Sequence, residues 1–225
     1  MTAEESRRQH IEKMGEPLGV QFAELWQEVA YLHLKWLEYV ELYGSKPTRL
    51  QLLNQAAPGF FGMLQRVLWE DILLHLARLT DPPRSGGRNE NLTVRNLPSL
   101  IDNPGLKRAL EELIEQLSEA TDFCRNLRNR HIAHRDLDLA LRPPSAPLKA
   151  GSRKQVNEAL KILSDILNMV QLPYEETQTY FRVGRTSGGA VSLLYTIALG
   201  NKAQERRREQ LLRGDEPEDS LPAEV

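Results

Sequence analysis

The densest group of chemically capable side chains in this sequence lies within residues 124–138. Its members are four arginines, two of the five histidines in the protein and two aspartates: Arg125, Arg128, Arg130, His131, His134, Arg135, Asp136 and Asp138. An imidazole can move a proton near neutral pH, and a guanidinium can hold an anionic oxygen through a rigid set of donors. This combination suits work on a phosphodiester, and it equally suits an ordinary charged helix end.

The spacing within this group limits which side chains can work together. On an ideal helix, the step from Arg128 to His134 is a rotation of about 240°, so the two would not face the same way. Either the helix breaks near His131, or the working pair comes from two chains. Arg130 and His134 do share a face, and Asp138 lies one turn further along, where it could orient His134. In an unbroken helix Arg130 is therefore the better partner.

The overall composition is that of a soluble globular protein. The chain has 225 residues, 40% of them hydrophobic and 27% charged, and its net charge of −2 argues against a general nucleic-acid coat protein. Any nucleic-acid contact must therefore come from a local basic patch. The single cysteine, Cys124, excludes an internal disulfide and a cysteine-based zinc site. We expect no metal or other cofactor, because no ligand spacing or glycine-rich phosphate loop stands out.

The first residues of the chain and its apolar runs indicate its expected location in the cell. The first residues are charged and lack the apolar core of a signal peptide. No uncharged apolar run approaches the roughly 20 residues needed to cross a bilayer. The sequence therefore predicts a reduced, cytoplasmic protein with no membrane partner.

Helical periodicity dominates the chain from residue 19 onward, with apolar residues recurring at steps of three and four. Glycines, prolines and caps bound the predicted helices, which are 19–43, 47–57, 60–79, 103–127, 152–172 and about 189–213. We find no internal repeat and no domain boundary. The predicted fold is all-α, a single-domain bundle of about five to seven helices. It occupies residues 18–213, between a polar arm or short helix at 1–17 and a disordered acidic tail at 214–225.

The helix predicted at 60–79 is apolar nearly all round, which is typical of a helix at the centre of a bundle. Asp71 and His75, at i and i+4 within it, either form a structural polar pair or support the site of residues 124–138. Cys124 lies on the apolar stripe of its own helix, so we interpret it as a small buried hydrophobe.

Residues 128–134, Arg-Asn-Arg-His-Ile-Ala-His, resemble the signature of the HEPN superfamily. That motif is an arginine, a polar residue, a few further positions and a histidine, with four to six residues between the arginine and the histidine; here five residues, 129–133, lie between them. A second stretch, Trp69 to Asp81 followed by Asn91-Leu92-Thr93, is similar to the U-type abortive-infection branch of the same superfamily. Together the two segments place a resemblance over roughly residues 20–200 and imply a small helical bundle.

The resemblance implies a function and a site. Many HEPN proteins are metal-independent endoribonucleases of phage defence or toxin–antitoxin systems, and in them two chains bring two motifs into one cleft. By position, His134 would be the catalytic histidine, Arg128 the phosphate-binding arginine and Asn129 the polar residue that orients them. RNA is then the expected substrate or ligand, a second copy of the chain the expected partner, and an antitoxin or regulator protein a further one.

The remaining charged residues of the group receive secondary roles in this hypothesis. Arg125 and Arg135 are candidates for RNA contacts, and the candidates for a supporting role in the site are Arg130, His131, Asp138, Asp71 and His75. The alternative hypothesis is a non-catalytic HEPN module that binds RNA, a nucleotide or a partner protein, since some members of the superfamily have lost catalysis.

Overall fold

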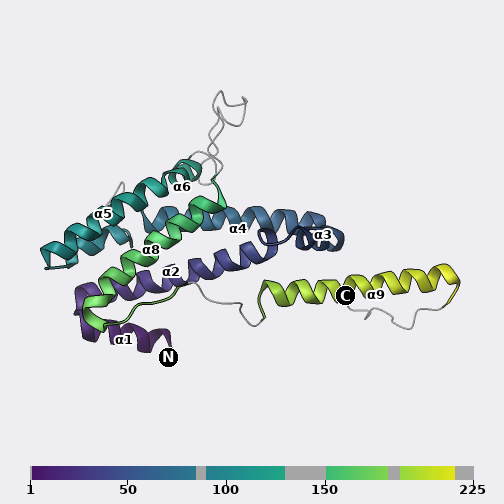
Figure 1. The fold of residues 1–225 in the computed structure, drawn as a ribbon, viewed down its shortest axis with the longest axis horizontal. Helices are drawn as coiled ribbons and strands as arrows, with labels where there is room; N and C mark the ends of the chain where they lie inside the picture. Colours follow the sequence, from purple (N-terminus) through teal and green to yellow (C-terminus); the bar gives the residue numbers. More distant parts are fainter. Residues whose placement is uncertain (1, 85–89, 130–150, 182–187, 216–225) are drawn as a thin grey trace, which may run out of the picture. The chain divides into compact units, whose positions relative to one another are not determined.

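The computed structural model describes residues 2–84, 90–129, 151–181 and 188–215 (Figure 1). These residues form helices and no named strand, so the predicted all-α class is confirmed. The described elements, in chain order, are α1 (Ala3–Met14), α2 (Glu16–Tyr43), α3 (Pro47–Ala56), α4 (Pro58–Leu79), the 3-10 helix η1 (Val94–Leu100), α5 (Pro104–Ala120), α6 (Asp122–Leu127), α8 (Arg153–Glu175) and α9 (Ala190–Arg213).

Caps and prolines start α3, α5 and α8 where the sequence predicts, whereas α2 begins at Glu16 and α4 at Pro58, earlier than the predicted 19 and 60. The Asn103 side chain accepts hydrogen bonds from two free backbone N–H groups at the start of α5, at 2.9 and 3.0 Å, and Pro104 follows as the first helical residue. Ser152 caps α8 by accepting from the backbone N–H of Gln155 at 3.3 Å. Prolines also begin α3 and α4. Local sequence signals therefore fix the helix starts.

The helix predicted from 103 to 127 is broken at Thr121, which separates α5 from α6. Thr121 is fully buried, and its hydroxyl donates to the Leu117 carbonyl at 2.8 Å and approaches that of Ser118 at 3.4 Å. A threonine that bonds back to the preceding turn competes with the backbone ladder and bends the helix. The apolar stripe continues across the break, so periodicity alone did not reveal it.

The predicted end of α8 before Pro173 is wrong, because the helix continues to Glu175 and closes with Glu176 in the left-handed region, at φ 50°. The added turn lies where Gln171 Nε2 donates to Glu175, and Gln171 in turn accepts from the Thr179 hydroxyl at 2.9 Å. The contacts of the last turn therefore compensate for the backbone hydrogen bond that Pro173 cannot make.

Two compact units divide the helices, one of Met1–Trp36 with Trp69–Val183 and one of Leu37–Leu68 with Gly184–Val225. The helices α2 and α4 contribute to both units. That residues 18–213 fold as one domain stays a prediction. In the first unit α5 packs along α8 and against η1, and α1 packs on α8 (Figure 1). Its core is a layer of fully buried aliphatic and aromatic side chains that includes Phe22, Leu76, Leu110 and Leu163.

In the second unit α3 packs against α9 around a small apolar cluster. The buried members of the cluster are Leu42, Leu53, Phe61, Ala190 and Leu194. The expectation that α4 is buried on most sides is wrong for this unit, because Phe60, Met63 and Val67 are each at least half exposed. Only the stripe that carries Phe61 finds partners there, since a helix in a small cluster buries one face.

The helix α1 is ordered and is held by a buried polar contact. His10 is 5% exposed, and its Nδ1 lies 3.0 Å from Glu175 Oε1 on α8, while its Nε2 lies 3.3 Å from the Ser6 hydroxyl. The crossing of α1 over α2 is close, because a Cβ at Gly19 would lie 2.5 Å from the Ile11 Cα. The region 1–17 therefore contains a docked helix.

We expect His10→Ala to lower the free energy of unfolding by about 1–3 kcal/mol, because it removes the hydrogen-bond partner of Oε1 of the buried Glu175 carboxylate. Urea unfolding followed by circular dichroism measures this. The control is Arg8→Ala, whose exposed side chain bonds only Glu4 on the same helix, and which should cost less than about 0.5 kcal/mol. Equal effects of the two substitutions would contradict the proposed role of the contact.

Candidate functional site

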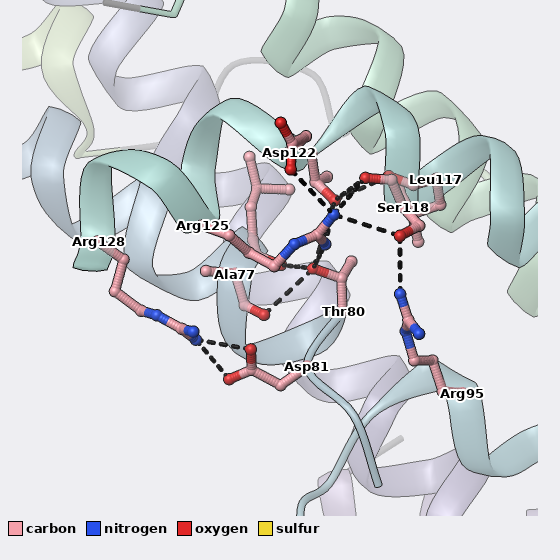
Figure 2. Close-up of polar contacts among 11 residues, drawn as sticks. Ala77, Thr80, Asp81, Arg95, Leu117, Ser118, Asp122, Arg125 and Arg128 are labelled. Carbon is pink, nitrogen blue, oxygen red and sulfur yellow. Dashed lines mark hydrogen bonds and ion pairs between the residues drawn. The ribbon is translucent and has the colours of Figure 1, made fainter. Parts of the chain in front are cut away.

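The motif arginine Arg128 is held by an aspartate from a distant part of the chain. Its Nη1 donates to both carboxylate oxygens of Asp81 at 2.6 Å (Figure 2). Its Nε donates to Asn129 Oδ1 at 3.0 Å. The side chains of Arg128 and Asp81 are 23% and 17% exposed. Asp81 follows the end of α4, and Arg128 follows the end of α6. A charge-assisted contact of this kind fixes the plane of the guanidinium.

A second arginine, Arg125, ties the ends of three elements together. Its Nη2 donates to the Ser118 carbonyl at 2.6 Å, and its Nη1 reaches the hydroxyls of Thr121 at 3.3 Å and Thr80 at 3.4 Å (Figure 2). Thr80 and Thr121 are both buried, so these bonds lie inside the protein. Arg125 thus joins α4 to the break between α5 and α6. That Arg125 contacts RNA stays a prediction, and such a contact would compete with these bonds.

The end of α4 is capped by side chains, and this positions Asp81. The Thr80 hydroxyl donates toward the carbonyls of Leu76 at 3.0 Å and Ala77 at 3.1 Å, and the Thr93 hydroxyl donates to that of Leu79 at 2.9 Å. The last carbonyls of a helix have no partner within it, so these bonds replace water in a buried place. The residue that follows, Asp81, therefore leaves the helix in one fixed direction.

Asp71 and His75 do not form the pair that their spacing suggested. Lys35 on α2 donates to Asp71 Oδ2 at 2.6 Å. His75 Nε2 lies 2.7 Å from Oε2 of Glu28, which is also on α2. Asp71 is exposed and His75 is buried, so they point to different surroundings. Each residue instead attaches α4 to α2. A supporting role in the site stays a prediction for both.

His75 is neutral at physiological pH. Burial lowers its pKa from 6.5 to about 4, and the positive charge of Lys35 adds to this effect, whereas Glu28 opposes it. The contact with Glu28 is close but poorly aligned for a hydrogen bond, and Nδ1 has no partner among the described residues. Arg78 donates to the same Glu28 oxygen at 2.8 Å. Glu28 is therefore held from two sides by α4.

Cys124 is the small buried hydrophobe that the sequence predicts. It is fully buried in α6, and burial raises the pKa of its thiol to about 12 despite the neighbouring Arg125 charge. A thiol with such a pKa carries almost no thiolate at neutral pH, so Cys124 is not a nucleophile here.

Several predicted site residues lie outside the described part of the chain. These are Arg130, His131, His134, Arg135 and Asp138. Of the expected catalytic set, Arg128 and Asn129 are described and in contact. Both have π-helical backbone geometry at the end of α6, a departure from the regular helix that is frequent at functional sites.

Sequence reasoning missed Asp81, Glu28 and the hydroxyls around Arg125. Asp81 stood within the stretch that carried the resemblance, yet it suggested no more than a helix end. The one local signal was an acidic side chain placed immediately after a long apolar helix and before Pro82-Pro83. Its partner is 47 residues away, a separation that periodicity cannot bridge.

The described residues form an all-helical fold in which Asp81 binds Arg128, the first residue of the predicted Arg-to-His motif. A family model for AbiU2, which is a HEPN family, matches residues 15–178. The chain belongs to this HEPN AbiU2 family and is an abortive-infection-related HEPN domain. No curated protein and no solved structure matches the chain. Among the described residues, no helix is both long and apolar enough to traverse a bilayer.

The pKa of His75 predicts a pH-dependent stability. Between pH 6.5 and about 4 the unfolded chain binds a proton at this position and the folded chain does not, so stability falls as the pH falls through this range. The loss should be on the order of 3 kcal/mol and should be absent above pH 6.5. Urea unfolding of the wild type and of His75→Gln at several pH values measures it. Equal slopes for both proteins between pH 6.5 and 4 would contradict the prediction.

Proposed function

We propose that this chain is a metal-independent endoribonuclease that cleaves RNA through the ribose 2′-hydroxyl, in abortive infection or as the toxin of a toxin–antitoxin pair. One observation carries the proposal: in a chain of the HEPN AbiU2 family, the arginine that opens the Arg-to-His motif is fixed by Asp81. A fixed guanidinium suits a phosphate whose negative charge grows in the transition state.

Each residue of the site receives a chemical role. His134 removes the proton from the 2′-hydroxyl, whose oxygen then bonds to phosphorus while the bond from phosphorus to the 5′ oxygen breaks. Arg128 stabilises the phosphorane oxygens, and Asp81 and Asn129 hold its guanidinium in place. Nη2 of Arg128 has no partner among the described residues, which supports an open donor for phosphate. The products are a 2′,3′-cyclic phosphate and a 5′-hydroxyl.

One imidazole does not easily remove one proton and donate another in a single step. A second copy of the chain would supply a second His134 to protonate the leaving 5′ oxygen, so the proposed active form is a homodimer. Arg135 contacts the RNA backbone, and Arg130, His131 and Asp138 support the histidine pair. An antitoxin or regulator protein would act by covering the cleft that the two copies of the motif form in the proposed homodimer.

A second candidate function is a non-catalytic HEPN module that binds RNA, a nucleotide or a partner protein. The charge state of Arg128 favours it, because Asp81 already neutralises the guanidinium that would attract phosphate. The net charge of −2 of the whole chain points the same way. This candidate requires binding without cleavage.

We expect the purified protein to cut RNA in the presence of EDTA and to leave 2′,3′-cyclic phosphate ends. His134→Ala should lower the rate at least 100-fold, because it removes the general base. Gel analysis of end-labelled RNA measures cleavage, and thermal unfolding checks that the variant keeps the wild-type stability. Cleavage that persists in folded His134→Ala would exclude His134 from the mechanism. RNA binding without any cleavage would favour the non-catalytic module.

Asp81→Asn should lower kcat roughly 10- to 100-fold, because Arg128 loses the charge that fixes its guanidinium. KM should stay the same or fall, since the substrate phosphate no longer competes with a carboxylate. The matched control is Asp122→Asn, because Asp122 is exposed and lies 3.7 Å from Arg125 in the same cluster. A rise in KM with unchanged kcat, or equal effects of both variants, would contradict a positioning role for Asp81.

A further inference from the structure

A cavity of about 290 Å³ lies beside the fixed arginine. Its lining residues come from α2, from the end of α4 and from the segment after residue 90: Glu28, Arg78, Leu79, Asp81, Asn91 and Leu92. Asp81 is shared between this cavity and Arg128, which it binds at 2.6 Å. Any group that enters the cavity therefore lies next to the proposed phosphate position.

The walls of the cavity are fixed before anything binds. On one side Arg78 donates to Glu28 Oε2 at 2.8 Å, and the buried His75 Nε2 lies 2.7 Å from the same oxygen. On the other, Asn91 donates to the carbonyls of Pro82 and Pro83, both at 2.8 Å, which ties residues 90–92 to the end of α4. A preformed cavity of this kind is typical of small-ligand sites.

The lining combines apolar surface with a carboxylate oxygen that has no partner among the described residues. Leu79 is buried, and Leu92 is 39% exposed at the edge. Arg78 and His75, both on α4, contact Glu28 at its Oε2 atom. The Oε1 atom of Glu28 has no partner among the described residues. Arg78 is mostly exposed, so it can meet a phosphate or the face of a ring at the entrance. Because the Asp81 oxygens bind Arg128, Oε1 of Glu28 is the carboxylate oxygen left for a ligand, and apolar surface beside it suits a flat heterocycle that carries an amine.

We propose that this cavity is a base-reading subsite, which takes the nucleobase next to the scissile phosphate and accepts its exocyclic amine at Glu28 Oε1. This inference rests on the proposed function and deepens it. Cytosine presents a 4-amino donor, whereas uracil presents a carbonyl oxygen at the same place. Two acceptors facing each other repel, so the subsite selects cytosine over uracil.

The substitution Glu28→Gln should change the preference for cytosine over uracil in a definite direction. In Glu28→Gln the amide oxygen stays at the Oε2 position, because Arg78 donates to that position. The amide NH2 then takes the Oε1 position and offers a donor to the cavity. A donor favours the uracil carbonyl over the cytosine amine, so the preference should be lost or reversed.

The experiment uses two pairs of matched RNA oligonucleotides. The members of the first pair differ only by cytosine or uracil on the 5′ side of the cut, and those of the second pair differ in the same way on the 3′ side. We expect the wild type to favour cytosine in one of these pairs by roughly 5- to 100-fold in kcat/KM, and Glu28→Gln to abolish or invert this ratio. The control is Glu24→Gln, one turn earlier on α2, where Glu24 meets only Arg7 at 3.6 Å. That variant should keep the wild-type ratio.

A second measurement separates this inference from the proposed function. Fluorescence anisotropy with the same oligonucleotides carrying 2′-O-methyl groups reports binding without cleavage. Cytosine preference in binding that depends on Glu28 would support the subsite even if no RNA is ever cut. Cleavage with equal rates for both bases, or a cytosine preference that survives in Glu28→Gln, would overturn the subsite and leave the endoribonuclease proposal intact.

A further variant covers the case in which Glu28→Gln fails to fold. Leu92→Trp fills the cavity from the side of its partly exposed residue Leu92 and leaves the Glu28 side chain itself unchanged. It should reduce the difference between cytosine and uracil to less than twofold. An unchanged preference in folded Leu92→Trp would overturn the subsite.

Discussion

The ion pair between Asp81 and Arg128 is the constraint on which the site depends. It joins the end of α4 to the end of α6 across 47 residues of sequence, and both side chains are mostly removed from water. A buried guanidinium needs such a partner, because the cost of desolvating an unpaired charge is large. The bonds of Thr80 and of Arg125 around it hold the two helix ends at the spacing that the pair requires.

The helices could be predicted from the sequence because the signals that form them are local. Apolar periodicity gave the faces, and Asn103, Ser152 and the helix-starting prolines gave the ends. It failed where a distant partner decides the outcome. The extension of α8 past Pro173 depends on contacts around Glu175, and the break at Thr121 depends on a hydroxyl turned back into its own helix. Neither effect has a periodic signature.

The same division applies to the site. The motif places Arg128 and Asn129 side by side, so their contact needs no information beyond the neighbouring residue, and their catalytic roles stay a prediction. Asp81 and Glu28 were missed because each becomes meaningful only through the partner that the fold delivers. For α4, periodicity told which residues share a face but not what covers that face. Hence the exposure of Phe60 and its neighbours on one side of the helix was not foreseen.

The contact between His10 and Glu175 has a consequence for protein synthesis. The two residues are 165 positions apart, so at 5–20 residues per second the ribosome needs about 10–30 s to make Glu175 after His10. During that interval α1 exists without the helix that covers its buried histidine. In the nascent chain this surface of α1 therefore stays uncovered until α8 has emerged, and only then can the first unit be completed.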